Sequence, residues 1–132
     1  MADVNTTQGA TRLELGRQTF ERVMGAPAQG FLDTVGGMAP GYGERILEWE
    51  FADAYNRSGL DLKTRELVIV AACAAIGATG HDAVRMHAPA ALRAGATRQE
   101  VIEVLIQIGF AAGLPASLGA LQAAVEAMAA SG

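Results

Sequence analysis

The sequence predicts an all-α protein of six or seven helices. Small residues dominate the chain, with 27 Ala and 16 Gly among 132 residues, and such side chains let helix backbones approach closely. In most segments apolar residues recur three and four positions apart, which is the spacing of one helix face. No segment has the strict alternation or the hairpin turn that strands require. These three features favour packed helices over a sheet.

Length and composition point to one globular domain with an aliphatic core. A chain of 132 residues corresponds to about one domain. We expect the polar residues 1–10 to form a flexible arm and residues 11–132 to form a single helical domain. A hydrophobic content of 51% excludes a disordered chain. With only one Trp, two Tyr and four Phe, the core must consist of aliphatic side chains.

Composition also excludes several functional classes. A single cysteine cannot form an internal disulfide, a redox pair or a thiolate zinc site. A net charge of −4 without basic clusters argues against a nucleic-acid surface. The longest apolar run, residues 67–78, is too short for a membrane span, which needs about 20 residues. The start of the chain lacks the basic and apolar parts of a signal peptide, so we expect a cytoplasmic protein.

The first half of the chain predicts three helical segments. Thr11–Met24 has an amphipathic pattern that ends at Gly25. Pro27–Met38 contains three glycines and predicts only one or two helical turns. Pro40–Tyr55 has one apolar face, which predicts a helix. Gly59 follows it as a helix breaker.

The middle of the chain predicts two further helices. Asp61 is a candidate N-cap for a helix from Leu62 to about Ile76. Because this helix is apolar on every face from its second turn on, we expect it to be central and fully buried. It ends at residues 77–80, and an Ala-rich helix follows over His81–Ala94, with Gly95 at its C-terminal cap.

The last third predicts two more helices. Thr97 and Glu100 have the spacing of a capping box, which opens a helix over Val101–Ala112. A break at residues 113–115 precedes the last helix, from about Ala116 to Ala130.

Glu66 is the first candidate for chemistry. Its neighbours at helical offsets are apolar, so its face points into the buried layer. They are Leu62, Ile69, Val70 and Cys73. Desolvation disfavours the charged form of such a carboxyl, as a general acid near neutral pH requires. The alternative is an ion pair with a neighbouring Arg or Lys.

His87 is the second candidate. Small residues surround it on its own helix, so its imidazole faces space in which a small ligand could fit. Its proton is exchangeable near pH 7. The alternative is a core histidine bonded to a backbone carbonyl.

His81 and Arg85 lie one helical turn apart, beside Asp82. They form either a solvated helix face or a cationic edge that holds a substrate carboxylate. We predict no metal site, because the six-residue spacing between His81 and His87 does not place them on one face.

Other conspicuous residues have structural interpretations. Cys73 lies in an apolar run and is expected to be buried and unreactive. A polar stripe at four-residue spacing predicts a solvent-facing side: Gln99, Glu103 and Gln107. The aromatic residues of one helix are expected in the core or at subunit contacts: Trp49, Phe51 and Tyr55.

Three stretches resemble a known family. Residues 59–69, GLDLKTRELVI, are similar to the GLD-KTRELV opening of carboxymuconolactone decarboxylases. Residues 87–121 resemble that family's pattern His-x-Ala-Gly-(Val/Ala)-Thr-x-x-Glu-Ile-x-Glu-Val-Leu-x-Gln and its Gly-x-Pro-Ala close. Residues 51–60, FADAYNRSGL, are similar to its Phe-Gly-x-x-Trp-x-Arg-Pro-Gly-Leu. Together the resemblance covers approximately residues 42 to 128.

The resemblance implies an alkylhydroperoxidase D-like all-α fold and a homo-oligomer, a trimer or a hexameric ring, with its pocket between subunits. Peroxidase members have a Cys-x-x-Cys pair seven and four residues before the matching histidine. This chain has Gly80 and Ala83 there, so thiol peroxidase activity is not expected. For the decarboxylase branch, the resemblance implies loss of CO₂ from a γ-carboxy butenolide without a cofactor.

Our leading hypothesis is therefore a cofactor-free lyase that acts on a small carboxylated lactone or oxo acid. Glu66 and His87 would supply acid–base and oxyanion roles, and Arg85, Arg65 or His81 would bind the substrate. The alternatives are a related cofactor-free isomerase or cyclase and a non-catalytic helical oligomer. We expect no metal, nucleic-acid or membrane partner.

Overall fold

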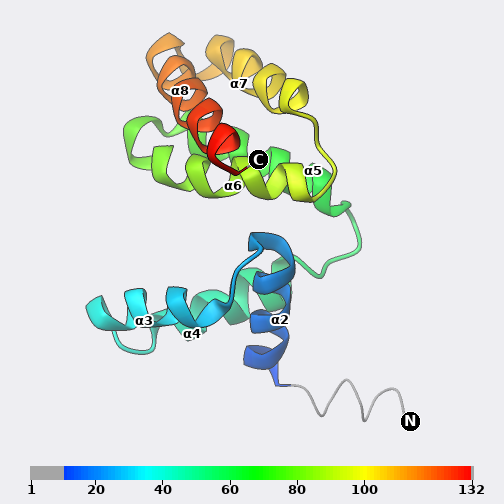
Figure 1. The fold of residues 1–132 in the computed structure, drawn as a ribbon, viewed down its shortest axis with the longest axis vertical. Coiled ribbons are helices and arrows are strands. Elements are labelled where there is room, and N and C mark those ends of the chain that lie inside the picture. The colour runs from blue at the N-terminus through cyan, green and yellow to red at the C-terminus, as the bar shows by residue number, and fades with distance from the viewer. Residues whose placement is uncertain (1–10, 132) are drawn as a thin grey trace. The chain divides into compact units, whose positions relative to one another are not determined.

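All regular structure in the described part of the chain is helical, as predicted. The computed structural model describes residues 11–131, which contain seven α-helices, α2 to α8, and two short helices of other types, η1 and η2 (Figure 1). The expected arm at residues 1–10 lies outside this range. Among the described residues, no helix is both long and apolar enough to cross a bilayer.

The chain divides into two compact units, the first ending at Gly59 and the second beginning at Leu60. The single domain expected over residues 11–132 stays a prediction.

The N-terminal unit comprises α2, α3, α4 and η1. Their bounds are Arg12–Met24, Ala28–Met38, Tyr42–Ile46 and Leu47–Ala54. Thr11 caps α2 in a capping box with Glu14, and Gly25 ends it in the left-handed conformation at φ 71°.

Two elements of this unit differ from expectation. α3 has 11 residues rather than one or two turns. Its Leu32 is buried and its Phe31 ring lies 5.3 Å from Phe20, and these contacts offset the low helix propensity of the glycines. The helix expected over Pro40–Tyr55 is split into the short α-helix α4 and the π-helix η1.

The core of the N-terminal unit is built around aromatic rings, so the wholly aliphatic core expected from composition is wrong for this unit. Phe51 packs edge-on against Phe20 with a centroid distance of 5.0 Å and stacks on Tyr55 at 4.9 Å. Helix α2 approaches η1 so closely that a Cβ on Gly16 would overlap the backbone oxygen of Leu47. Phe51 and Tyr55 are buried, as expected, whereas Trp49 is 76% exposed.

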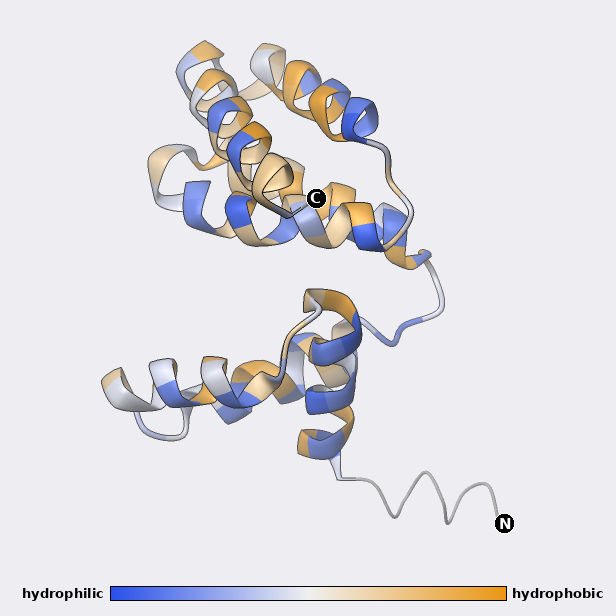
Figure 2. Ribbon diagram, viewed as in Figure 1, coloured by the Kyte–Doolittle hydropathy of each residue, from blue (hydrophilic) through white to orange (hydrophobic). Residues whose placement is uncertain are grey.

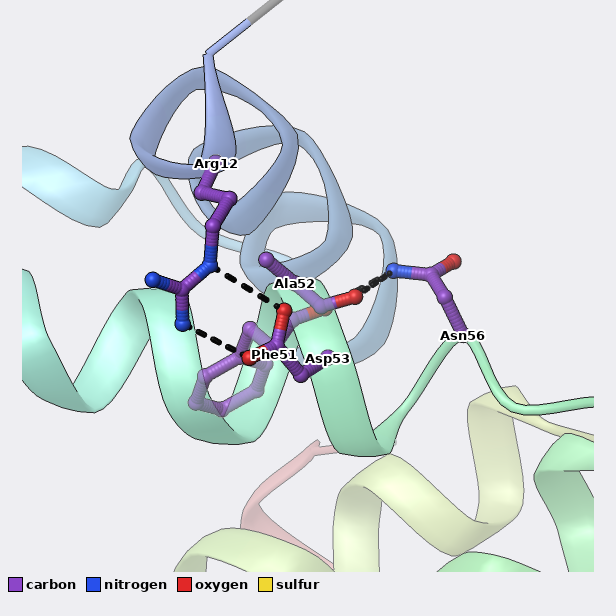
Figure 3. Close-up of polar contacts among 5 residues, drawn as sticks. All are labelled: Arg12, Phe51, Ala52, Asp53 and Asn56. Atoms are coloured by element: carbon purple, nitrogen blue, oxygen red, sulfur yellow. Dashed lines mark hydrogen bonds and ion pairs between the residues drawn. The ribbon is translucent and has the colours of Figure 1, made fainter.

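Two sets of polar contacts lie in this unit (Figure 3): an ion pair on the surface joins α2 to η1, and a partly buried amide bonds the end of η1. The guanidinium of Arg12 donates to both oxygens of Asp53, at 3.3 and 2.6 Å, and this hydrogen bonding raises the pKa of Arg12. The amide of Asn56 donates to the carbonyls of Phe51 and Ala52, each at 2.9 Å, and ends η1.

The C-terminal unit comprises α5, η2, α6, α7 and α8. Their bounds are Leu62–Ala75, Gly77–Gly80, His81–Arg93, Arg98–Ala112 and Leu114–Ser131. Asp61 caps α5, and the Thr97–Glu100 capping box opens α7; both caps were predicted. Gly95, at φ 105°, follows α6 one position beyond the residue that caps it.

Helix α6 packs against α5 and α8, and α7 packs against α8 and α5. The core between them is aliphatic and rich in alanine, as composition predicted. Its fully buried members include Val70, Ala74, Val84, Ala88, Ala91, Val101, Leu105, Ala120, Ala123 and Ala124.

The expectation that α5 is buried on every face is wrong. Only Glu66, Val70 and Ala74 of this helix are buried, while Val68 is 53% exposed. The helix is apolar all round, but its neighbours α6 and α7 cover only one side of it. Cys73 is likewise only partly buried, although it packs against the core.

Candidate functional site

The central feature of the C-terminal unit is a buried contact between Glu66 and His87. Glu66 lies in the second turn of α5 and His87 in the middle of α6. Oε1 of Glu66 is 2.8 Å from Nδ1 of His87. Glu66 is 0% exposed and His87 7% exposed. The packing of α5 on α6 thus brings together the two residues that the sequence singled out for catalysis.

Apolar side chains enclose this pair. Val70, one turn after Glu66, is fully buried, and so are Val84, Ala88 and Ala91 around His87. A carboxylate in such surroundings is costly unless hydrogen-bond donors satisfy it. The Nδ1–H of His87 can donate to it, and the bond strengthens when the ring becomes an imidazolium.

The start of α5 is fixed from two sides, which holds Glu66 in place. Asp61 accepts a hydrogen bond from the backbone N–H of Thr64 at 2.7 Å, and bonding to Thr64 lowers the pKa of Asp61. Lys63 forms an ion pair of 2.7 Å with Glu100 at the start of α7, and its hydrogen bond lowers the pKa of Glu100. These contacts tie the first turn of α5 to α7.

The turn before α6 leaves no room for a side chain at Gly80. A Cβ there would overlap the carbonyl oxygen of Cys73. Gly80 occupies one of the two positions where the resemblance places the peroxidase cysteines. The backbone itself therefore opposes a cysteine at that position.

The two candidate arginines have different surroundings. Arg85 is on the surface of α6, where its Nη1 donates to Glu126 of α8 at 2.9 Å. Arg65 is half-buried beside Glu66 in the sequence, and its Nε donates to the carbonyl of Leu60 at 3.1 Å. The solvated-face interpretation thus agrees with the position of Arg85.

His81 is separated from His87 by its packing. Its ring lies directly on Gly119 of α8, and its Nε2 is buried with no hydrogen-bond partner among the described residues. His87 instead faces α5 through Glu66. Within residues 11–131, no group of three or more His, Cys, Asp or Glu side chains could hold a metal ion.

The sequence indicated Glu66 and His87 as two separate candidates but did not predict that their side chains contact each other. The local signal was the same for both, a polar residue on an apolar helix face. Their contact depends on how α5 crosses α6. The Lys63–Glu100 ion pair was also missed, because its two residues are half-buried surface positions that lie far apart in the sequence.

Comparison with known proteins assigns this sequence to a family. The model of the carboxymuconolactone decarboxylase family matches residues 40–126. This range is more than half of the chain, and it includes both Glu66 and His87. The chain belongs to the carboxymuconolactone decarboxylase family.

Two relatives are informative. The 4-carboxymuconolactone decarboxylase of Acinetobacter baylyi is 36% identical over 81 residues, which are 61% of this chain and 59% of the relative. A Paracoccus denitrificans protein named "Uncharacterized 15.0 kDa protein in nqo9-nqo10 intergenic region" is 42% identical over 79 residues, 60% of this chain and 59% of that protein. The chain thus spans about three fifths of the length of each.

Proposed function

We propose that this member of the carboxymuconolactone decarboxylase family is a cofactor-free carboxy-lyase. Its substrate class would be small carboxylated lactones or oxo acids. The observation that carries the proposal is the buried Glu66–His87 pair. The relative named 4-carboxymuconolactone decarboxylase supports the reaction type.

The proposed reaction needs an acid and a site that tolerates a dispersed negative charge. The bond between the substrate carboxylate and the ring breaks, CO₂ leaves, and the electron pair spreads over the lactone as a dienolate. An acid then protonates a ring carbon. Hydrogen-bond donors near the lactone oxygen lower the energy of the dienolate.

His87 fits the role of the acid. Because its Nδ1 faces Glu66, Nε2 is the nitrogen left to meet a substrate. The reacting ring is an imidazolium, whose Nδ1–H donates to the carboxylate of Glu66 while its Nε2–H delivers its proton to carbon. The neutral ring that remains takes a proton from the solvent, and the carboxylate of Glu66 stabilises the imidazolium that forms again. Glu66 thus acts mainly by orienting and charging the imidazole.

A cation is needed for the substrate carboxylate. Arg65 is our first choice, because it precedes Glu66 and is partly buried. Arg85 would have to exchange its contact with Glu126 for the substrate. His81 remains a third candidate through its buried Nε2.

The test is release of CO₂ from 4-carboxymuconolactone by the full-length, metal-free protein. We expect His87→Ala to lower kcat at least ~10²-fold, the low end for general acid–base catalysis. The matched control is Glu103→Gln, which changes an exposed residue of α7 and should keep full activity. Full activity of His87→Ala would remove this histidine from the chemistry and overturn the proposal.

The same assay separates the alternatives. A cyclase or isomerase would convert cyclic ketones or lactones without releasing gas. A non-catalytic helical oligomer would turn over none of these compounds. We also propose that the protein is a homo-oligomer and that it is cytoplasmic.

A further inference from the structure

The N-terminal unit carries a hollow on the surface of α4 and η1, which we call the Trp49 hollow. Its lining consists of Tyr42, Arg45, Ile46, Trp49 and Glu50. Its volume is about 360 Å³, near the lower end of the range of roughly 300–1,000 Å³ for small-molecule sites. None of these residues takes part in the reaction proposed above.

Two large aromatic side chains of the lining are open to solvent. Tyr42 is 58% exposed and Trp49 76% exposed, whereas Phe20 and Phe51 fill the core of the same unit. Residues seven positions apart on a helix lie on the same side of it, and these two line one hollow. An aromatic ring favours a flat partner that stacks on it or meets it edge-on. The two rings therefore favour a planar ligand.

Arg45 lies between the two rings in the sequence and adds a positive charge. It is exposed, and its guanidinium makes no hydrogen bond or ion pair with any of residues 11–131. Arg12 and Arg85, by contrast, are each paired with a carboxylate. The parallel N–H donors of a guanidinium match the two oxygens of a carboxylate. This favours a ligand that carries a carboxylate group.

Glu50 limits the charge of such a ligand. It lines the same hollow, and a carboxylate there repels a second negative charge. The net charge of −4 on the whole chain acts in the same direction. A ligand with one negative charge is therefore favoured over one with two.

The mixed polarity of this surface argues for a small molecule. Hydrophilic and hydrophobic segments alternate along α4 and η1 (Figure 2). The centre of a protein interface is normally depleted of charged residues, yet Arg45 and Glu50 are two of the five residues that line the hollow. A nucleic acid would need several cations for its phosphates, and the lining contains one.

We propose that the Trp49 hollow binds a planar monocarboxylate, an aromatic acid being the simplest case. The carboxylate pairs with Arg45, the flat ring packs against Trp49 and Tyr42, and Ile46 adds an apolar contact. The inference rests on the lining of this hollow and not on the proposed reaction. It predicts binding whether or not the protein decarboxylates anything.

The test uses Trp49 itself as the reporter, because it is the only tryptophan of the chain. Benzoate is the probe, and it is titrated into the full chain at neutral pH while the tryptophan emission is followed. We expect a saturable change with a Kd in the millimolar range, since a ligand this small in an open hollow makes few contacts.

Three analogues of the probe separate its chemical features. Benzamide keeps the shape of benzoate without the charge and should bind at least ~10-fold more weakly. Cyclohexanecarboxylate keeps the charge without the flat ring and should bind about 3-fold more weakly. Phenyl phosphate carries nearly two charges at neutral pH and should also bind more weakly than benzoate, because of Glu50.

Variants assign the contacts to residues. Arg45→Gln should raise the Kd for benzoate at least ~10-fold, and Arg45→Lys should have a smaller effect, because it keeps the charge but loses the planar fork. Tyr42→Leu should raise the Kd about 3-fold. Since Arg45 and Tyr42 are exposed, all three variants should keep the helical circular dichroism of the wild type.

Arg22→Gln is the matched control, because Arg22 is an exposed arginine of α2 outside the lining of the hollow. It should leave the Kd unchanged. The proposal is overturned by a wild type without a saturable response, or by equal Kd values for Arg45→Gln and the wild type. Benzamide or phenyl phosphate binding as tightly as benzoate would overturn it too. So would an emission maximum that shifts with protein concentration in the absence of any ligand, because a second copy would then fill the hollow.

Discussion

The two units of the chain solve the problem of buried polar groups in different ways. In the N-terminal unit the buried Thr19 hydroxyl accepts a hydrogen bond from the neutral amide of Asn56 at 3.0 Å. In the C-terminal unit Ser117 likewise donates to a backbone carbonyl, that of Leu105, at 2.7 Å. Among residues 11–131, the C-terminal unit alone also buries two titratable groups against each other, Glu66 and His87.

Under the proposed function, this difference marks where the chemistry takes place. A neutral hydrogen bond contributes about 1 kcal/mol and suffices to hold a fold together. A buried pair of ionisable groups often stabilises no better than apolar residues of the same volume. Its presence in an aliphatic core therefore needs a reason other than stability, and the proton transfer proposed above supplies one. The N-terminal unit, with its aromatic core, contains no pair of this kind among residues 11–59.

The largest effect should come from breaking that pair on one side. We expect His87→Leu to destabilise the C-terminal unit by about 3–5 kcal/mol, because it takes away the imidazole that faces the buried carboxylate. The double variant Glu66→Leu/His87→Leu should recover most of this loss while remaining inactive. Urea unfolding followed by circular dichroism gives both values.

Thr19→Val is the counterpart in the N-terminal unit and should cost only about 1 kcal/mol. If His87→Leu lowered the free energy of unfolding by no more than Thr19→Val, the Glu66–His87 pair would contribute no more than a neutral hydrogen bond. The contrast between the units would then disappear.

The next largest effect concerns two glycines at which the backbones are too close for a side chain. Gly16→Ala should destabilise the N-terminal unit and Gly80→Ala the C-terminal unit, each by roughly 1–3 kcal/mol, because the new Cβ overlaps a backbone oxygen. Hydrogen exchange should show lost protection in α2 and η1 for the first variant and in α5 and α6 for the second.

Gly30→Ala is the control for both, because nothing lies within 4 Å of a Cβ at that position. Gly30 is in α3, so alanine there should stabilise by about 0.5–1 kcal/mol. Equal behaviour of all three alanine variants would contradict the close approach described above.

A smaller effect is expected at the two capping boxes, one in each unit. Thr11→Ala and Thr97→Ala each remove a side chain that accepts a hydrogen bond of 3.0 Å from a backbone N–H. Each should cost about 1 kcal/mol. The variants Thr11→Ser and Thr97→Ser keep the hydroxyl and should restore most of the stability in thermal unfolding.

Local sequence patterns were sufficient for most of the fold. Most helix ends depend on residues within a few positions of each other. The caps at Asp61 and Thr97 are examples. The π-helix η1 was not predicted, because its i to i+5 bonding, as from Tyr55 to Glu50, carries no distinct residue signal. The exposed side of α5 was missed since apolar periodicity does not tell how many neighbours a helix has.

The candidate site was only half predictable for a similar reason. The apolar surroundings of Glu66 and His87 are local and were read directly from the spacing. The contact between them joins residues 21 positions apart and exists only once α5 and α6 have packed. Likewise, the sequence could not distinguish Arg85 as a partner of Glu126 from Arg85 as a free cation.

The smallest effect should appear in acid, and it again separates the units. Hydrogen bonding lowers the pKa of Glu100 in the C-terminal unit, chiefly through Lys63. A group with a lowered pKa contributes its full stability above its unfolded value, roughly 4.3 for Glu, and loses it as the pH falls through the folded pKa. In the N-terminal unit Asp53 raises the pKa of Arg12 instead. The titration of Arg12 therefore changes stability only at strongly alkaline pH. Glu100→Gln should lower stability at pH 7 and flatten the loss below pH ~4.3. An acid limb that is as steep in Glu100→Gln as in the wild type would show that the Lys63–Glu100 contact contributes nothing to holding α5 against α7.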